Sequence, residues 1–324
     1  MTLAILATLV GLLALWWSAD RFVGGASAVA THMGVSPLLV GMLIVGFGTS
    51  APELVVSAFA AAGGDPGIAL GNAIGSNIAN IGLILGATAI LVPIAVHRGV
   101  LVREMPLLLG LTVLLAVLML DGEISRVDAL ILVAALGAQI AWSIWDARRR
   151  QREAEPDELA IEVEERERIE AMSRARAWAW TLGGIVLLVV ASRVLVWGAV
   201  GIAQRLGWSD LVIGLTVVAV GTSAPELAAA IAAARRGATE LVLGNVIGSN
   251  IFNTLAVVGL AGLIAPTVVE PVALARDLPV LVIFTVALVA MGYRPRGHGR
   301  INRIEGAVLM TAWVAYTVAL VATA

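Results

Sequence analysis

Two glutamates, Glu53 and Glu226, occupy equivalent positions in a sequence pattern that occurs twice, 173 residues apart. The repeated motifs are GTSAPEL (48–54 and 221–227), LGN (70–72 and 243–245) and IGSNI (74–78 and 247–251). Each glutamate stands well inside an apolar run, and a charge at the centre of a membrane helix costs about 2.5–3.5 kcal/mol. A buried carboxylate is tolerated when it is protonated, paired or bound to a cation. Because no arginine is near either glutamate in the sequence, the motif indicates a bound proton or metal ion.

Proline and threonine residues flank the first glutamate. Pro52 lacks a backbone N–H and its ring clashes with the carbonyl of Gly48, so we expect a kinked helix with a freed carbonyl. Carbonyls freed at membrane depth need partners, and a bound cation can be one. Thr49 and Glu53 are four residues apart and are therefore expected to share a helix face. The second copy repeats these features with Pro225, Gly221, Thr222 and Glu226.

The apolar run after each glutamate carries a polar side chain at every fourth residue. These side chains are Asn72, Ser76 and Asn80 in the first copy and Asn245, Ser249 and Asn253 in the second. Hydrogen bonds between helices could explain such a stripe alone, but with the glutamates it predicts an all-oxygen site. Hard oxygen ligands suit Ca²⁺, Na⁺ and Mg²⁺, and the reluctance of Mg²⁺ to dehydrate favours Ca²⁺ and Na⁺. Two carboxylates neutralise one Ca²⁺, two Na⁺ or two H⁺, so a site that accepts either load produces exchange.

The composition is that of a helical membrane protein that crosses the bilayer several times. Of 324 residues, 60% are hydrophobic and 14% charged, whereas soluble domains are nearer half apolar and a quarter charged. The net charge of −2 gives no basic excess for binding nucleic acid, and the absence of cysteine excludes disulfides and thiolate metal sites. We expect no cofactor besides the transported ions. The expected partners are Ca²⁺ and Na⁺, with H⁺ as an alternative, and the lipid bilayer, and the expected oligomeric state is a monomer.

Ten apolar runs are long enough for membrane helices, which need about 20 residues each. They are 2–24, 36–63, 67–91, 100–120, 126–146, 176–200, 209–236, 239–264, 272–292 and 304–323. The runs are too long for strands and do not alternate between apolar and polar residues. The sequence therefore predicts an all-α polytopic membrane protein without strands.

The ten helices divide into two halves around one charged segment. Residues 1–146 form the first five-helix repeat, 147–175 a charged linker, and 176–324 the second five-helix repeat. An odd number of helices inverts the second copy relative to the first. Inverted repeats are common in secondary transporters, whose sites lie near the midplane where the repeats meet.

The placement of arginines predicts the orientation. The side of the membrane that holds the linker also holds most loop arginines, and such a side is normally cytoplasmic. The linker is therefore expected to be cytoplasmic and both termini to lie outside.

GTSAPE followed by GNxxGSNIxN, present twice, resembles the alpha repeats of the cation/calcium antiporter superfamily, and most closely the sodium/calcium exchangers of prokaryotes. The resemblance covers essentially the whole chain. It implies a prokaryotic inner-membrane antiporter that exchanges several Na⁺ for one Ca²⁺ by alternating access. The first and sixth helices would slide over a more rigid core.

The resemblance also implies roles for individual residues. Glu53 and Glu226 would bind Ca²⁺ and share in Na⁺ binding. The other implied oxygen donors are Thr49, Ser50, Thr222 and Ser223, the carbonyls of Gly46 and Ala219, Ser76 and Ser249 at the outer sites, and Asn80 and Asn253 beside the central site.

One departure from the family pattern bears on the counter-ion. Some relatives carry an acid at the position of Asn80 or Asn253, whereas both are amides here. This argues against a third permanent negative ligand and against the K⁺-dependent branch, and it leaves proton coupling open. The leading hypothesis is a Na⁺/Ca²⁺ antiporter that extrudes Ca²⁺; an H⁺/Ca²⁺ antiporter and a cation channel are the alternatives. No nucleophile–base pair stands out, so an enzyme is not expected.

Overall fold

The computed structural model describes residues 1–153, 172–206, 221, 223–293 and 299–323. In chain order the helices are α1 (Thr2–Met33), α2 (Pro37–Val40), α3 (Gly46–Thr49), α4 (Ala51–Ala62), α5 (Pro66–Ala79), α6 (Gly86–Leu91), α7 (Met105–Leu118), α8 (Arg126–Glu153), α10 (Arg174–Arg205), α13 (Ala224–Arg235), α14 (Thr239–Phe252), α15 (Val258–Ile264), α16 (Leu278–Gly292) and α17 (Arg303–Thr323). Short π-helical turns extend or join them: η1 (Gly41–Val45), η2 (Asn80–Leu85), η3 (Val100–Glu104), η5 (Asn253–Val257) and η6 (Ala273–Asp277).

Eight of the described helices are long and apolar enough to cross a membrane, and a bent pair makes up to nine. The bent pair, Leu38–Thr49 and Ala51–Ala62, turns by 44° at Ser50. These segments correspond to nine of the ten expected spans. The first half of the remaining one, 209–236, lies outside the described residues apart from Gly221, and its second half is described as α13.

Two helices, α1 and α10, are longer than expected, at 32 residues each. The first span was expected to end at residue 24, where hydropathy falls in the small-residue segment 24–33 (GGASAVATHM). That segment remains helical because its small side chains pack on α10: a Cβ built on Gly25 would lie 2.8 Å from the backbone nitrogen of Thr181.

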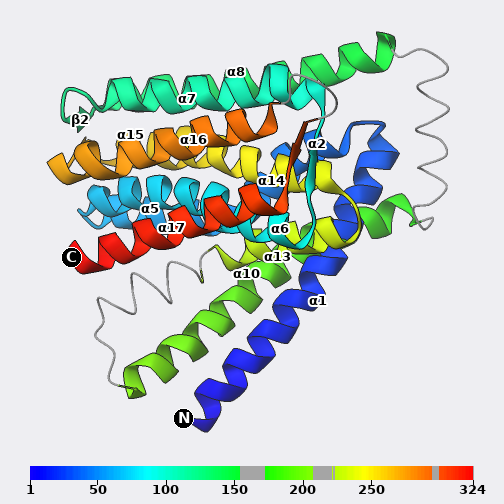
Figure 1. Cartoon of the computed structure of the whole chain (residues 1–324), viewed down its shortest axis with the longest axis horizontal. Coiled ribbons are helices and arrows are strands. Elements are labelled where there is room, and N and C mark those ends of the chain that lie inside the picture. The colour runs from blue at the N-terminus through cyan, green and yellow to red at the C-terminus, as the bar shows by residue number, and fades with distance from the viewer. Residues whose placement is uncertain (154–171, 207–220, 222, 294–298, 324) are drawn as a thin grey trace.

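Four short strands lie at helix connections, so the expectation of a fold without strands is wrong in detail. β1 (Ile94–Val96) pairs with β4 (Gly299–Ile301), and β2 (Glu123–Ile124) pairs with β3 (Thr267–Val268). The apolar-run analysis missed them because each has only two or three residues. The two ladders lie at opposite ends of the helical core, and each joins a loop of the first half to a loop of the second (Figure 1).

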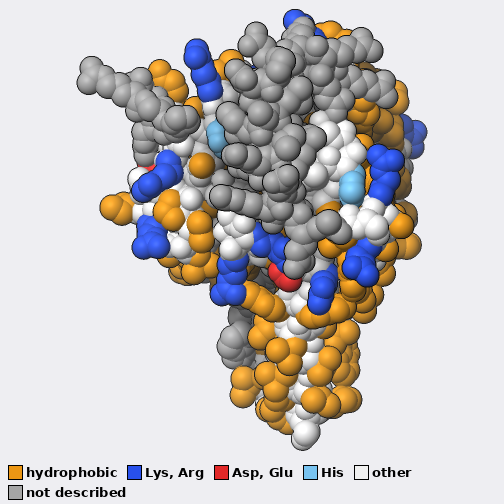
Figure 2. Space-filling model, turned by 90° about the vertical axis from the view of Figure 1, so that its right-hand side faces the viewer, with side chains coloured by type: hydrophobic (Ala, Val, Ile, Leu, Met, Phe, Trp, Pro, Cys, Tyr) orange, Lys and Arg blue, Asp and Glu red, His pale blue; other side chains and the backbone are white. Residues whose placement is uncertain are grey.

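The core is a bundle whose central members are the two stripe-bearing segments, α5–η2–α6 and α14–η5–α15. In these two segments 78% and 83% of the most apolar window is buried, against 11–39% in the other single spans. The polar stripes are therefore shielded from lipid by the surrounding helices. Arginine side chains gather on the end of the molecule that carries the β1–β4 ladder, and apolar side chains cover the part that projects below it (Figure 2).

The projecting part consists of α1 and α10, which cross diagonally beside the core (Figure 1). Their contacts show that they run antiparallel and touch through glycines: Gly11 faces Leu195, and Gly184 faces Phe22. The 173-residue offset relates Gly11 to Gly184 and Phe22 to Leu195, so the second contact repeats the first with the two helices exchanged. A further matched pair of contacts joins Gly25 to Thr181 and Gly198 to Thr8. Small residues at such interfaces let two helix backbones approach closely.

The close approach predicts opposite effects of alanine at two glycines of α10. A Cβ at Gly198 would lie 2.6 Å from the backbone nitrogen of Thr8, whereas a Cβ at Gly183 meets no described atom within 4 Å. Gly198→Ala should destabilise the protein by about 1–3 kcal/mol through overpacking. Gly183→Ala should be neutral or stabilising by up to about 1 kcal/mol, because alanine favours helix. Thermal unfolding of the detergent-purified variants would measure both, and equal midpoints would contradict the packing described.

Candidate cation-binding site

Each motif glutamate lies in the first turn of a new helix rather than in the middle of a kinked one. Glu53 is in the first turn of α4 and Glu226 in the first turn of α13. Pro52 favours this arrangement because its missing N–H is not needed at a helix start. The expectation that Thr49 and Glu53 share one helix face is therefore wrong, because the break at Ser50 separates them. A helix N-terminus favours negative charge, which lowers the cost of burying each carboxylate.

The structure brings the two glutamates together although 173 residues separate them. Each of the two residues is only 2% exposed to solvent. The Ser50 hydroxyl donates to Oε1 of Glu226 at 3.4 Å, which ties the first motif to the acid of the second. The two carboxylates lie within electrostatic range of each other. The site is therefore a pair of buried acids, one in the first turn of α4 and one in the first turn of α13.

Several buried polar atoms at this point have no hydrogen-bond partner among the described residues. They are Oε2 of Glu53, Oε2 of Glu226, Oδ1 of Asn77, and both amide atoms of Asn253. Buried polar groups are normally hydrogen-bonded, so a cluster of carboxylate and amide oxygens without partners fits a bound cation. The described residues contain no cluster of three acids, histidines or cysteines, so hydroxyl, amide and carbonyl oxygens would complete the coordination.

An asparagine holds the first turn of each glutamate helix in place. Nδ2 of Asn72 donates to the carbonyl of Glu53 at 3.3 Å, and Nδ2 of Asn245 donates to the carbonyl of Glu226 at 3.2 Å. The same bond thus occurs in both copies of the motif. Asn72 also donates to the Ser57 hydroxyl at 3.0 Å. Its amide is therefore held by a second acceptor in the first copy.

Further hydrogen bonds join one motif copy to the other. The Thr49 hydroxyl donates to Oδ1 of Asn245 at 3.2 Å. The Ser249 hydroxyl donates to the carbonyl of Gly46 at 3.3 Å. These bonds join Thr49 to the asparagine that bonds the Glu226 carbonyl, and Ser249 to Gly46, while the part of all three in ion binding stays a prediction. They also occupy part of the acceptor capacity of Gly46, although a carbonyl oxygen has two lone pairs.

Two asparagines of the IGSNI motifs, Asn77 and Asn250, were not singled out by the sequence analysis. Nδ2 of Asn80 donates to Oδ1 of Asn250 at 2.8 Å, and Nδ2 of Asn250 donates to the Asn77 carbonyl at 3.4 Å. Nδ2 of Asn77 donates to the Thr254 hydroxyl at 2.9 Å. Their recurrence in both motif copies was the available signal. They fell outside the stripe because they are not at its four-residue spacing.

The hydrogen bond between asparagine side chains of the two motif copies forms in only one of its two equivalent places. Asn80 donates to Asn250, but the equivalent bond from Asn253 to Asn77 is not formed. This leaves Oδ1 of Asn77 and the Asn253 amide among the atoms without a partner in the described part of the chain. The site is therefore not symmetric in this structure, although its sequence repeat is.

The remaining expected donors have mixed outcomes. Ser76 and Ser223 are buried, and Ser223 immediately precedes α13. The carbonyl of Gly221, expected to be freed by Pro225, accepts a hydrogen bond from the Ser192 hydroxyl of α10 at 2.7 Å. That carbonyl is thus at least partly satisfied by protein. Thr222 and Ala219 lie outside the described residues.

Comparison with known proteins agrees with this geometry. The family described as sodium/calcium exchanger protein matches residues 3–145 and 176–322. The chain belongs to the sodium/calcium exchanger family. CaxA of Alkalimonas amylolytica is 42% identical over 98% of this chain and 98% of its own length. The sodium/calcium exchanger MaX1 of Methanosarcina acetivorans is 33% identical over 98% of this chain and 99% of its own.

A solved structure of the sodium-calcium exchanger NCX_Mj, soaked with zero Na⁺ and Ca²⁺, has the same fold. It superposes with a TM-score of 0.84 at 32% identity and covers 98% of this chain and 99% of that one. The resemblance drawn from the motifs is therefore confirmed. The protein is a multi-pass membrane cation/Ca²⁺ antiporter rather than a member of an enzyme family.

The bridging role of Asn250 predicts a large effect of its removal. Asn250 is 1% exposed, and Asn250→Ala would leave the Asn80 amide without its acceptor. A buried group left unpaired costs about 1–3 kcal/mol. Ser57→Ala is a suitable control, because Asn72 keeps its bond to the Glu53 carbonyl. Thermal unfolding should show a clearly larger loss for Asn250→Ala, and a loss no larger than that of the control would contradict the bridge.

Proposed function

We propose that this protein exchanges Na⁺ for Ca²⁺ by alternating access and normally extrudes Ca²⁺. The observation that carries the proposal is the pair of buried carboxylates from the two motif copies, surrounded by oxygens without partners. Glu53 and Glu226 are the central ligands in this proposal. The other proposed donors are Thr49, Ser50, Thr222, Ser223, Ser76, Ser249, Asn80 and Asn253, with the carbonyls of Gly46 and Ala219.

The charge of the site supplies the coupling. Two ionised carboxylates at close range in a low-dielectric interior repel each other strongly. One Ca²⁺ or two Na⁺ would offset that repulsion, and an empty site would retain it. A transition between the two access states would therefore be favoured for the loaded protein and disfavoured for the empty one, which is the requirement for exchange rather than leak.

The proposed scaffold is ten membrane helices in two inverted five-helix repeats. Several features support it: the matched glycine contacts of α1 and α10, the two strand ladders at opposite ends, and π-helical turns that begin at equivalent residues, Asn80 and Asn253. The arginine-rich end (Figure 2) would be cytoplasmic in a prokaryotic inner membrane. The linker 147–175 would lie on that side and both termini outside.

Proton coupling is the second candidate, and one observation favours it. Asn80 and Asn253 are both neutral, so the two glutamates alone could carry two protons in exchange for one Ca²⁺. The roles of the glutamates are the same in either case. Only the counter-ion differs.

Neutralising either glutamate should abolish exchange. Glu53→Gln and Glu226→Gln preserve side-chain size but remove the charge that binds the cation, so Na⁺-gradient-driven ⁴⁵Ca²⁺ uptake into proteoliposomes should fall to background. Glu123→Gln, an exposed acid in β2, is the control and should keep wild-type uptake. Wild-type uptake by both site variants would refute the assignment.

The counter-ion is tested by changing only the gradient. Wild-type proteoliposomes should take up ⁴⁵Ca²⁺ when loaded with Na⁺ and diluted into Na⁺-free buffer at equal pH inside and outside. Uptake driven by a pH gradient with Na⁺ absent throughout, and none driven by Na⁺, would select the proton antiporter. Ca²⁺ flux that needs neither gradient would instead indicate a channel.

A further inference from the structure

The helix pair α1–α10 is fastened to the core at one end by charged side chains. Oδ1 of Asp20, in α1, accepts hydrogen bonds from Nε and Nη2 of Arg236 at 3.0 and 2.7 Å. The neighbouring Arg235, the last residue of α13, places its guanidinium over the Trp16 ring of α1, 4.2 Å from the ring centroid. We call this the Arg236 end. It holds α1 against α13.

The 173-residue offset relates Asp20 to Arg193 of α10. The alignment is secure at this point, because the same offset relates the contact glycines Gly11 to Gly184 and Gly25 to Gly198 on either side. Equivalent positions therefore carry opposite charges. Arg193 is also the single charged residue of α10 between Arg176 and Arg205. An ionisable residue in the middle of a membrane helix generally marks a functional site.

The core position equivalent to Arg236 carries no charge, but an acid follows two residues after it. The offset relates Arg236, which follows α13, to Gly63, which follows α4. Both chain segments then continue through a glycine with positive φ, Gly237 at 75° and Gly64 at 97°. The next residue after Gly64 is Asp65. An acid on α1 thus faces a base on the core at one end, and a base on α10 has an acid available on the core at the other.

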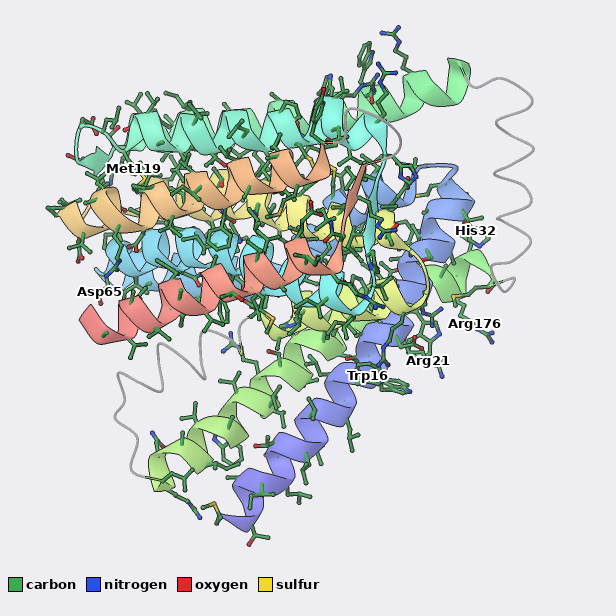
Figure 3. The ribbon with its side chains drawn as sticks, in the orientation of Figure 1. Trp16, Arg21, His32, Asp65, Met119 and Arg176 are labelled. Carbon is green, nitrogen blue, oxygen red and sulfur yellow. The ribbon has the colours of Figure 1, made fainter. Side chains whose placement is uncertain are left out.

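The second pair is not formed in this structure. Arg193 and Asp65 are both exposed, and within the described residues neither has an ion-pair partner. Whereas α1 packs along α13, its counterpart α10 makes no comparable contact with α4, and both of these helices are fully described. Asp65 lies at the opposite end of the core from Trp16 and Arg21 (Figure 3). We call this the Asp65 end.

We propose that Arg193 and Asp65 pair when the α1–α10 unit moves to close the Asp65 end, so that the carrier has two ion-pair latches that form in alternate states. Asp20–Arg236 holds the state described here, and Arg193–Asp65 holds the opposite one. The interdigitated glycine contacts make α1 and α10 move together, so one latch opens as the other closes. This inference rests on the alternating access of the proposed function. Two latches of similar strength keep both states populated, as a two-state carrier needs.

Cross-linking tests the second latch without any measurement of transport. The chain contains no cysteine, so Arg193→Cys with Asp65→Cys introduces the only two thiols. A short bismaleimide should join them in at least one of four conditions: saturating Na⁺, saturating Ca²⁺, low pH, or none of these ions. The pair Arg193→Cys and Asp121→Cys is the matched control, because Asp121 belongs to the α7–α8 connection, and it should not cross-link. Failure of the test pair in all four conditions, or equal cross-linking of the control, would overturn the proposal.

Charge reversal tests whether the attraction matters. Loss of an exposed ion pair should shift the balance of states by about fivefold, so Arg193→Asp and Asp65→Arg should each slow ⁴⁵Ca²⁺ exchange by about that factor or more. The double variant Arg193→Asp with Asp65→Arg restores opposite charges and should recover most of the rate. Arg205→Asp, at the end of α10, is the control and should leave the rate unchanged.

These measurements distinguish failure of the proposed function from failure of the latch. Wild-type protein without Na⁺-driven exchange would defeat the proposed function, whereas the cross-linking result would still decide whether the latch exists. Active wild type together with single reversals at the wild-type rate, or a double variant no faster than the singles, would overturn the latch alone. Equilibrium ⁴⁵Ca²⁺ binding in detergent should be unchanged in Asp65→Arg, because Asp65 follows the far end of α4 from Glu53, and lost binding in this variant would contradict the assigned role.

Discussion

The structure depends on the burial of two carboxylates at one point in a low-dielectric interior. Such a pair is stable only if its charge is balanced and its surroundings are polar. The chain meets this requirement in several ways. It starts a helix at each acid, so that both carboxylates lie at a helix N-terminus, and it fixes each start with an asparagine, Asn72 or Asn245. In the proposed function the remaining charge is balanced by the transported ion, and this would make the protein a carrier rather than an inert bundle.

The repeated motifs made much of this predictable, because they contain the two buried acids, the asparagines Asn72 and Asn245, and the helices that carry them. The apolar runs also located nine described spans, while the tenth and the order of two repeats remain predictions. What failed was local geometry. The bend expected near Pro52 is present, but the sequence did not show that a new helix begins after Ser50, because a proline can begin a helix as well as bend one. The bridging amides Asn77 and Asn250 were missed because their partners lie in the other motif copy, and sequence spacing gives no information about contacts across 173 residues.

The error in the expected end of the first span also concealed the importance of the charged residue Asp20 in α1. If the first span ended at residue 24, as expected, Asp20 would lie near a helix end, where a charge costs little. In the structure α1 continues to Met33, so Asp20 lies well inside it and needs a partner, which Arg236 provides. Hydropathy could not place that end, because the alanines and glycines of 24–33 are weakly apolar. Their role is to allow close helix contact, and that is visible only when α10 is present.

The two asymmetries of the molecule have a common explanation. On the proposed scaffold, two inverted copies would be symmetric if both ends were equally open, yet α1 packs along α13 of the second half while α10 makes no comparable contact with α4 of the first. In the site, likewise, Asn80 bonds to Asn250 while Asn253 and Asn77 remain apart. An inverted repeat that adopts one access state must break its own symmetry, and the opposite state exchanges the roles of the two copies. The unmade contacts at both levels are therefore the ones that the other state would use, and this links the amides beside the acids to the helices at the surface.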